Sequence, residues 1–213
     1  MSALAAVEAY RRIADVYDQA PNPLLALERR TLEPLLPDLR GLLVADVAAG
    51  TGRWTEYCQA RGAHTIALDA CHEMLARAPR PSAQADARNI PLRDNSADMV
   101  MCAFALGYAP AAFAELVRIL RPGGTLIVSD VHPDALARGW SRSFRTGAEV
   151  IEVAHEGYTL DALHHATLRL SHLLEPTLGE PERALFARAG KLEAFEQATR
   201  HPAIFVAQWK KLC

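Results

Sequence analysis

The chain lacks the features that mark membrane, secreted and nucleic-acid-binding proteins. No apolar run reaches the roughly 20 residues that a helix needs to span a bilayer, and the sequence does not open with the basic and apolar regions of a signal peptide. Its 23 Lys and Arg are balanced by 25 Asp and Glu, a formal net charge of -2, whereas proteins that follow a phosphate backbone usually carry a basic excess. We therefore expect a cytoplasmic protein with no membrane span and no nucleic-acid partner.

Cysteine is also scarce, and its spacing indicates neither a disulfide framework nor a metal site. We interpret the four cysteines as reduced thiols, at Cys58, Cys71, Cys102 and Cys213. The histidines lack the i, i+4 spacing of a helical zinc site, so the sequence predicts no metal.

Short apolar runs alternate with helical patterns through the 213 residues, half of which are hydrophobic. The runs are typical of buried parallel strands and lie at 42–47, 65–69, 83–87, 99–104 and 125–129, with two weaker ones at 168–174 and 203–209. Helices are predicted over 3–18, 22–36, 53–60, from 73, over 113–120 and over 181–198. Strands that alternate with helices predict a doubly wound α/β sheet.

A glycine-rich turn follows the first predicted strand, in the stretch from Asp46 to Gly52. Glycine lets the backbone approach a ligand closely, and the free amides of the helix that follows can face that ligand. A structural tight turn would look the same. Thr55 stands where the dinucleotide fingerprint needs its third glycine, which argues against a dehydrogenase.

Two acids follow the next two predicted strands. Asp69 can accept hydrogen bonds from ribose hydroxyls, or it can cap the helix after it. Asp86, which precedes Ile90-Pro91-Leu92, can accept a hydrogen bond from an adenine amino group, or it can be an exposed loop residue. The order and spacing of the turn and the two acids argue against coincidence and predict a nucleoside site.

These motifs resemble those of class I S-adenosylmethionine (SAM)-dependent methyltransferases, in particular compact bacterial enzymes related to quinone C-methyltransferases. The matching residues are Asp46-x-x-x-Gly50-x-Gly52, Leu68-Asp69 with Met74-Leu75, Ala85-Asp86-Ala87 with Ile90-Pro91-Leu92, Ala97-Asp98-Met99-Val100 and Leu120-Arg121-Pro122-Gly123-Gly124. The resemblance implies a Rossmann-like fold with seven mostly parallel strands, helices on both faces and an antiparallel last strand beside the sixth.

The resemblance also implies SAM as cofactor, S-adenosylhomocysteine as product and a set of contacts to them. Those contacts are Tyr17 at the cofactor carboxylate, Asp46, Ala48, Gly50 and Gly52 around the methionine part, Asp69, Ala70 and Met74 at the ribose and nucleoside, Asp86 and Ala87 at the adenine, and Ala103 and Phe104 near the sulfonium. Ala48 stands where such enzymes usually have glycine, and it adds only a methyl group.

We expect one domain over residues 1–213, made of four parts. They are an N-terminal helical lid (1–39), a SAM-binding core (40–131), a substrate cover (132–167) and a C-terminal segment of strands and helix (168–213).

The acceptor's end of the site has no motif. DNA amino-methyltransferases carry Asn/Asp-Pro-Pro-aromatic after the fourth strand, and this chain does not. His132 follows the fifth predicted strand, where parallel sheets bind ligands. His132, Tyr108 and His155 are therefore the candidates for a catalytic base or a substrate contact. Loop packing is the alternative for the histidines, and closure of the pocket by its ring is the alternative for the tyrosine.

The predicted function is methyl transfer from SAM to a carbon, oxygen or nitrogen of a small organic acceptor, in quinone or natural-product biosynthesis. The protein would act as a monomer or a homodimer. Two alternatives stay open: a SAM-binding enzyme of the same fold that catalyses a cyclisation or decarboxylation, and a SAM-binding regulatory subunit.

Overall fold

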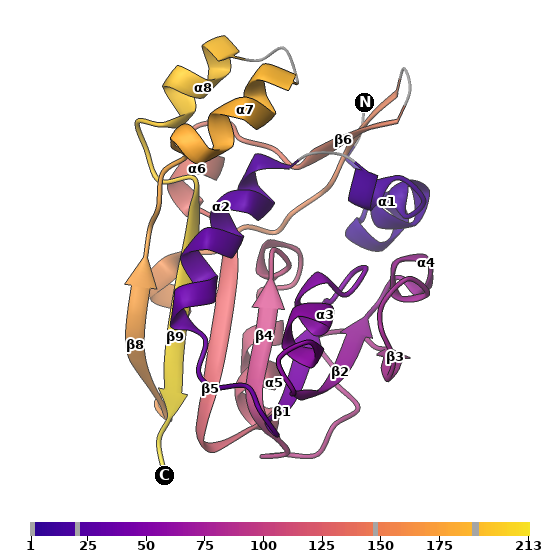
Figure 1. Cartoon of the computed structure of the whole chain (residues 1–213), viewed down its shortest axis with the longest axis vertical. Helices are drawn as coiled ribbons and strands as arrows, with labels where there is room; N and C mark the ends of the chain where they lie inside the picture. Colours follow the sequence, from indigo (N-terminus) through magenta and orange to yellow (C-terminus); the bar gives the residue numbers. More distant parts are fainter. Residues whose placement is uncertain (1–2, 20–21, 147–148, 189–191) are drawn as a thin grey trace.

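The centre of the molecule is a seven-stranded sheet. The computed structural model describes residues 3–19, 22–146, 149–188 and 192–213. The strands of the sheet are β1 (Leu43–Val47), β2 (His64–Asp69), β3 (Ser82–Gln84), β4 (Ala97–Ala103), β5 (Leu120–Val131), β8 (Leu168–Leu174) and β9 (Ile204–Lys211). Their order across the sheet is β3-β2-β1-β4-β5-β9-β8 (Figure 1).

The strand directions confirm the predicted topology. The first five strands pair in parallel, and β9 runs antiparallel to both of its neighbours, β5 and β8. The last strand is therefore inserted beside the sixth, between it and the fifth. The fold is an α/β, Rossmann-like arrangement.

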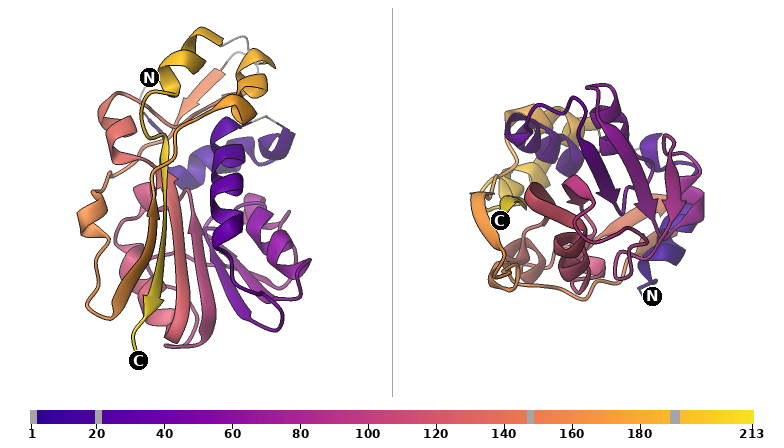
Figure 2. Two further views of the ribbon diagram at one scale, coloured as in Figure 1. Left: turned by 60° about the vertical axis from the view of Figure 1, so that its left-hand side comes forward. Right: turned by 90° about the horizontal axis from the view of Figure 1, so that it is seen from below.

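Helices cover both faces of this sheet. They are α1 (Ala6–Ile13), α2 (Pro23–Leu32), α3 (Arg53–Gln59), α4 (His72–Leu75), α5 (Ala112–Ile119), α6 (Pro133–Ala137), α7 (Glu180–Arg188) and α8 (Leu192–Ala198). In Figure 1, α2 and α3 lie in front of the sheet and α5 lies behind it, and Figure 2 shows the same layers from two other sides. None of the described helices is long and apolar enough to cross a membrane.

The alternation of side chains along each strand creates two cores. Successive residues of a strand point to opposite faces, so Val44 packs with the helices in front of the sheet, while Ala45 and Val47 pack with α5. Both groups are buried. This is why β1 is apolar on both faces, as expected of a central parallel strand.

The predicted elements differ from the structure at several places. The third strand is shorter than 83–87, and the fifth starts earlier than 125, at Leu120. The helical prediction over 181–198 is met by α7 and α8, with 189–191 outside the described residues. The segment 132–160, expected to be irregular, contains α6 and the hairpin of β6 (Ser143–Thr146) and β7 (Glu149–Glu152).

The predicted two-helix lid divides into two parts. The first helix, α1, lies over the carboxyl ends of the parallel strands, where the Leu4 amide donates to the Glu152 carbonyl (2.9 Å) beside β7. The second helix, α2, packs along the front of the sheet through Leu27 and Leu32, which are fully buried. The hairpin and α1 therefore form the cover, and α2 belongs to the main body.

Candidate functional site

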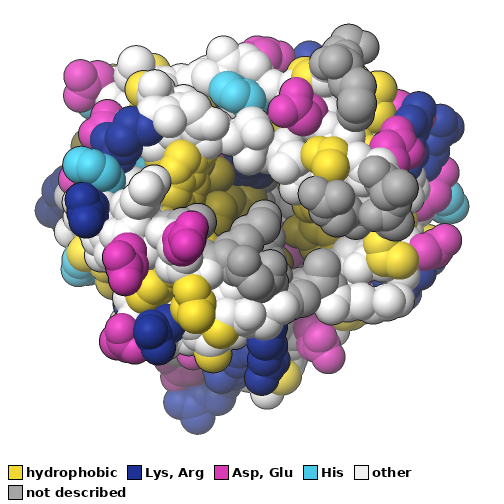
Figure 3. Space-filling view, turned by 90° about the horizontal axis from the view of Figure 1, so that it is seen from above, with side chains coloured by type: hydrophobic (Ala, Val, Ile, Leu, Met, Phe, Trp, Pro, Cys, Tyr) yellow, Lys and Arg dark blue, Asp and Glu magenta, His cyan; other side chains and the backbone are white. Residues whose placement is uncertain are grey.

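A cavity of about 470 Å³ lies at the carboxyl ends of β1, β2 and β4. Its walls are completed by α1, α4 and residues 154–156. Figure 3 shows it as a hollow lined by hydrophobic side chains on the face seen from above. The volume falls within the range of small-molecule sites, and the carboxyl ends of parallel strands are where such sites form.

All of the predicted cofactor contacts except Gly52 line this cavity. The lining contacts are Tyr17, Asp46, Ala48, Gly50, Asp69, Ala70, Met74, Asp86, Ala87, Ala103 and Phe104. Gly52 is buried behind the cavity wall and begins α3 with a φ of +82°. This conformation lets the chain enter the helix, and the cofactor contact of Gly52 stays a prediction.

The turn after β1 contains residues whose backbone is in the left-handed region, at alternate positions. Ala48 and Gly50 have φ values of +56° and +58°. A left-handed alanine costs roughly 1 kcal/mol, and such strain concentrates at functional sites. A Cβ at Gly50 would lie 3.3 Å from Cε of Met74. A side chain at position 50 would therefore crowd Met74, which also lines the cavity.

Asp69 connects the turn to the second strand. One carboxylate oxygen accepts from the Gly50 amide and the other from the Cys71 amide, each at 2.7 Å. Burial raises the pKa of this carboxyl above its ordinary value. Asp69 thus caps the start of α4 and also faces the cavity. A carboxylate has about four lone-pair sites, so two remain for ribose hydroxyls.

Asp46 is the most deeply buried acid of the cavity wall. Its side chain is 2% exposed and accepts a hydrogen bond from Oγ1 of Thr55 at 2.6 Å. Burial raises its pKa to about 6. Compared with the unfolded chain, the folded protein therefore keeps this carboxyl protonated up to a higher pH, whereas a bound cation would favour the ionised form.

This raised pKa makes a pH-dependent stability prediction for Asp46→Asn. The folded carboxyl titrates near pH 6 and the unfolded one near 3.8, so Asp46 lowers the stability of the wild type as pH rises through that window. The variant, which stays neutral and can still accept from Thr55, should be more stable than wild type by about 3 kcal/mol above pH 6. Urea unfolding at several pH values measures the difference, which should fade below about pH 4; a constant difference would contradict the prediction.

Asp86 lies at the rim of the cavity. It is exposed and ion-paired with Arg88 (2.7 Å), and that contact lowers its pKa. The Arg88 amide also donates to it at 2.9 Å. Both the loop interpretation and the ligand interpretation fit: a short turn holds an ionised carboxylate at the cavity's edge.

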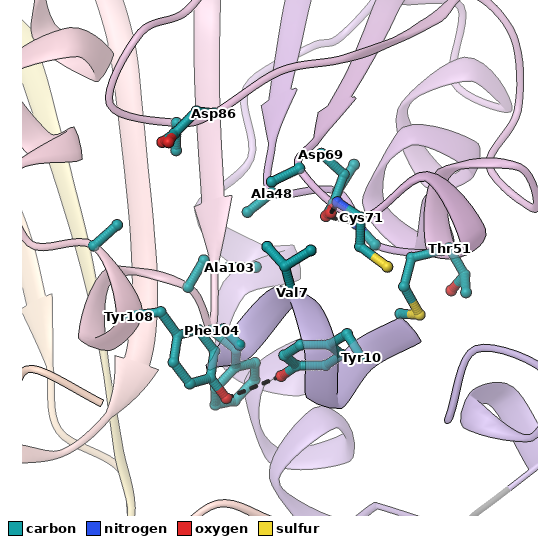
Figure 4. A pocket seen from close by; sticks show the side chains of 18 of the residues that line it. Val7, Tyr10, Ala48, Thr51, Asp69, Cys71, Asp86, Ala103, Phe104 and Tyr108 are labelled. Atoms are coloured by element: carbon teal, nitrogen blue, oxygen red, sulfur yellow. Dashed lines mark hydrogen bonds between the residues drawn. The ribbon is translucent and has the colours of Figure 1, made fainter. Parts of the chain in front are cut away.

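The cavity is also lined by Tyr108 and His155, the residues predicted to face the acceptor, and by Tyr10, which the sequence did not single out. The hydroxyl groups of Tyr10 and Tyr108 are 3.0 Å apart. Figure 4 shows them meeting on the side of the cavity away from Asp69 and Asp86. His155 is exposed at the rim.

His132 is not among the residues that line the cavity, so its role as a catalytic candidate stays a prediction without support from the cavity's geometry. It is 4% exposed, caps α6 by accepting from the Asp134 amide (3.1 Å) and contacts Glu175 through Nε2 (2.8 Å). Its place at the end of β5 serves the helix that starts at Pro133. Within the described residues, no group of three or more His, Cys, Asp and Glu is arranged to hold a metal ion.

Two buried groups of charged residues were not predicted from the sequence. Glu28 of α2 is fully buried and accepts hydrogen bonds from Arg53 (2.6 Å), the Trp54 indole and Ser129. It fixes α2 to α3 and β5. The second is the ion pair of Arg142 with Asp130. Neither carries a local signal, because the partners are far apart in the chain.

The sheet order and the cavity define a Rossmann-like α/β protein with a nucleoside-type site. Solved structures share this fold. A SAM-dependent methyltransferase from Mesorhizobium loti has a TM-score of 0.65 at 23% identity, over 86% of this chain and 97% of that one. The [4+2]-cyclase SpnF has a TM-score of 0.59 at 18% identity, over 88% and 81%.

Residues 45–128, less than half of the chain, match the family described as methyltransferase domain. The malonyl-[acyl-carrier protein] O-methyltransferase of Pectobacterium atrosepticum is 33% identical over 149 residues, which are 65% of this chain and 58% of that protein. The chain thus spans little more than half the length of this relative.

Proposed function

We propose that the chain transfers a methyl group from SAM to a small organic acceptor. The observation that supports this best is the set of carboxylates at three strand ends, Asp46, Asp69 and Asp86, around one cavity with the left-handed turn after β1. These groups suit an ammonium, a ribose and an adenine, in that order along the wall. Gly50 has no side chain to occupy the cavity at this wall, where its left-handed turn lines the cavity.

The roles of the residues follow from their positions. Bound SAM supplies a methyl group on a positively charged sulfur. Asp69 would orient the ribose, since its own geometry is set by two backbone amides. Ala103 and Phe104 would form an apolar wall beside the reacting carbon, and α1 would exclude water above it. Exclusion of water and fixed orientation are the main contributions that a methyl transfer needs.

The acceptor can be free or linked to a carrier. The Pectobacterium relative acts, by its name, on a malonyl group carried by a protein. Natural-product or quinone biosynthesis is the setting we propose for this chain, with the protein as a monomer or a homodimer.

A reaction without methyl transfer is the second candidate, because a cyclase shares the fold. Titration calorimetry with SAM, followed by mass spectrometry of S-adenosylhomocysteine in the presence of acceptor pools, separates the possibilities. Binding with release of S-adenosylhomocysteine supports methyl transfer. Binding with acceptor conversion but no such release supports the cyclase type, and failure to bind SAM at millimolar concentration would overturn both.

A further inference from the structure

The hydroxyl groups of Tyr10 and Tyr108 form a small polar site in an otherwise apolar end of the cavity. Their oxygens are 3.0 Å apart, and the lining around them includes Val7, Phe104 and Ala105 (Figure 4). Two hydroxyls have two protons, and only one can lie between the oxygens. The pair therefore has one O–H left to donate to a ligand.

A buried cation stands behind this pair. The guanidinium of Arg142, whose side chain is 13% exposed, lies 4.6 Å from the Tyr108 ring centroid and 5.4 Å from that of Phe104. It donates to the Phe104 carbonyl and is ion-paired with Asp130. The positive end of this ion pair is the end that contacts the tyrosines.

Asp130 completes the support of the segment that carries Tyr108. It is 1% exposed and accepts from the Gly107 amide at 2.8 Å. Phe104, at the end of β4, has a φ of +54°, a strained conformation for a bulky residue. Arg142 thus holds the start of the segment 104–108 through the Phe104 carbonyl, and Asp130 holds its end through the Gly107 amide. Their ion pair joins Arg142, from the segment 132–167, to Asp130 of β5.

The tyrosines are suited to donate hydrogen bonds and unsuited to act as bases. Burial raises the pKa of Tyr10 well above its ordinary value. Glu156, Arg88 and His155 also line the cavity, and all three are exposed. A ligand oxygen would find both a donor and a nearby cation here, whereas the positive charge of an ammonium group would be disfavoured by the Arg142 cation.

On the basis of the function proposed above, we propose that the acceptor is an organic acid that Tyr10 and Tyr108 orient and that is methylated on a carboxylate oxygen. A lone pair of that oxygen forms the new O–C bond while the C–S bond breaks, and the electron pair of the broken bond goes to sulfur. The products are a methyl ester and S-adenosylhomocysteine. No proton moves, because a carboxylic acid with an ordinary pKa near 4 is already ionised at neutral pH. The site therefore needs no general base.

The test is a matched acceptor series with the full chain and SAM. Short mono- and dicarboxylic acids, free and as N-acetylcysteamine thioesters, are compared with primary amines of the same skeleton by S-adenosylhomocysteine release and product mass. We expect turnover of acids and not of amines. The Tyr10→Phe/Tyr108→Phe double variant should lower kcat/KM for the best acid by roughly 30-fold, the loss of one hydrogen bond to a charged group. The SAM affinity of this double variant should equal that of the wild type. The control variant Tyr57→Phe, on α3, should keep both the wild-type SAM affinity and the wild-type kcat/KM.

Arg142 is a positioning residue in this scheme. The Arg142→Met/Asp130→Asn variant removes both charges together and should reduce the preference for acid over amine while SAM still binds. Preference for amines, no turnover of any acid by a SAM-binding protein, or full acid turnover by the double tyrosine variant would each overturn the acid assignment. Failure of SAM to bind the wild type would instead overturn the proposed function.

Discussion

Replacement of Asp69 by alanine should weaken SAM binding by about 100-fold or more, the loss expected when two charge-assisted hydrogen bonds to ribose hydroxyls disappear. The structure adds a second reason. The same carboxylate holds the Gly50 and Cys71 amides, so its removal also releases the turn that approaches the ligand. Titration calorimetry with SAM and with S-adenosylhomocysteine gives the two affinities directly.

Two controls separate ligand binding from folding. Asp161→Ala removes an exposed acid of the short helix Leu160–Ala162 and should leave both affinities unchanged. Asp69→Asn retains one acceptor oxygen and should give an intermediate affinity. If Asp69→Ala binds SAM within about threefold of wild type while its thermal unfolding stays cooperative, the ribose assignment is wrong.

Gly52→Ala should destabilise the protein by about 3 kcal/mol, the sum of a left-handed alanine and an overpacked wall. A Cβ at this position would lie 2.5 Å from Cδ of Pro79 and 3.1 Å from the backbone of Ala78. Neither neighbour is the flexible end of a long side chain. The measurement is the free energy of unfolding from urea titration.

Gly41→Ala is the matched control for this substitution. Gly41 has a similar φ of +73°, but a Cβ there would meet no atom within 4 Å. Its cost should be only that of the backbone conformation, roughly 1 kcal/mol. Equal losses at the two glycines would show that packing against Pro79 contributes nothing.

The sheet and the donor's side of the site could be predicted because their signals are local. β1 and β4 are continuous apolar runs, and Asp69 directly follows its strand, so neighbours in sequence define both the element and its end. Parallel strands bring those ends together without further information. The antiparallel direction of β9 was predicted only from the resemblance to the methyltransferase family.

The contacts around Tyr108 could not be predicted because they join distant segments. Tyr10 meets Tyr108 across 98 positions, and Arg142 reaches Phe104 and Asp130 from the cover. No local pattern in the sequence predicts pairs of residues that lie so far apart in the chain. The end of a strand suits a ligand and suits a helix cap equally well, and at His132 the structure shows the cap, because Pro133 starts α6 there.

The position of β9 has a consequence for synthesis on the ribosome. Strand β8 is made before β9, yet among the described residues β9 is its only pairing partner in the sheet. Until residues 204–211 have emerged, β5 and β8 each present an open edge with unpaired amides and carbonyls, the kind of surface that invites aggregation. The five parallel strands can pair as they are made, but β8 can join the sheet only after β9 has been made.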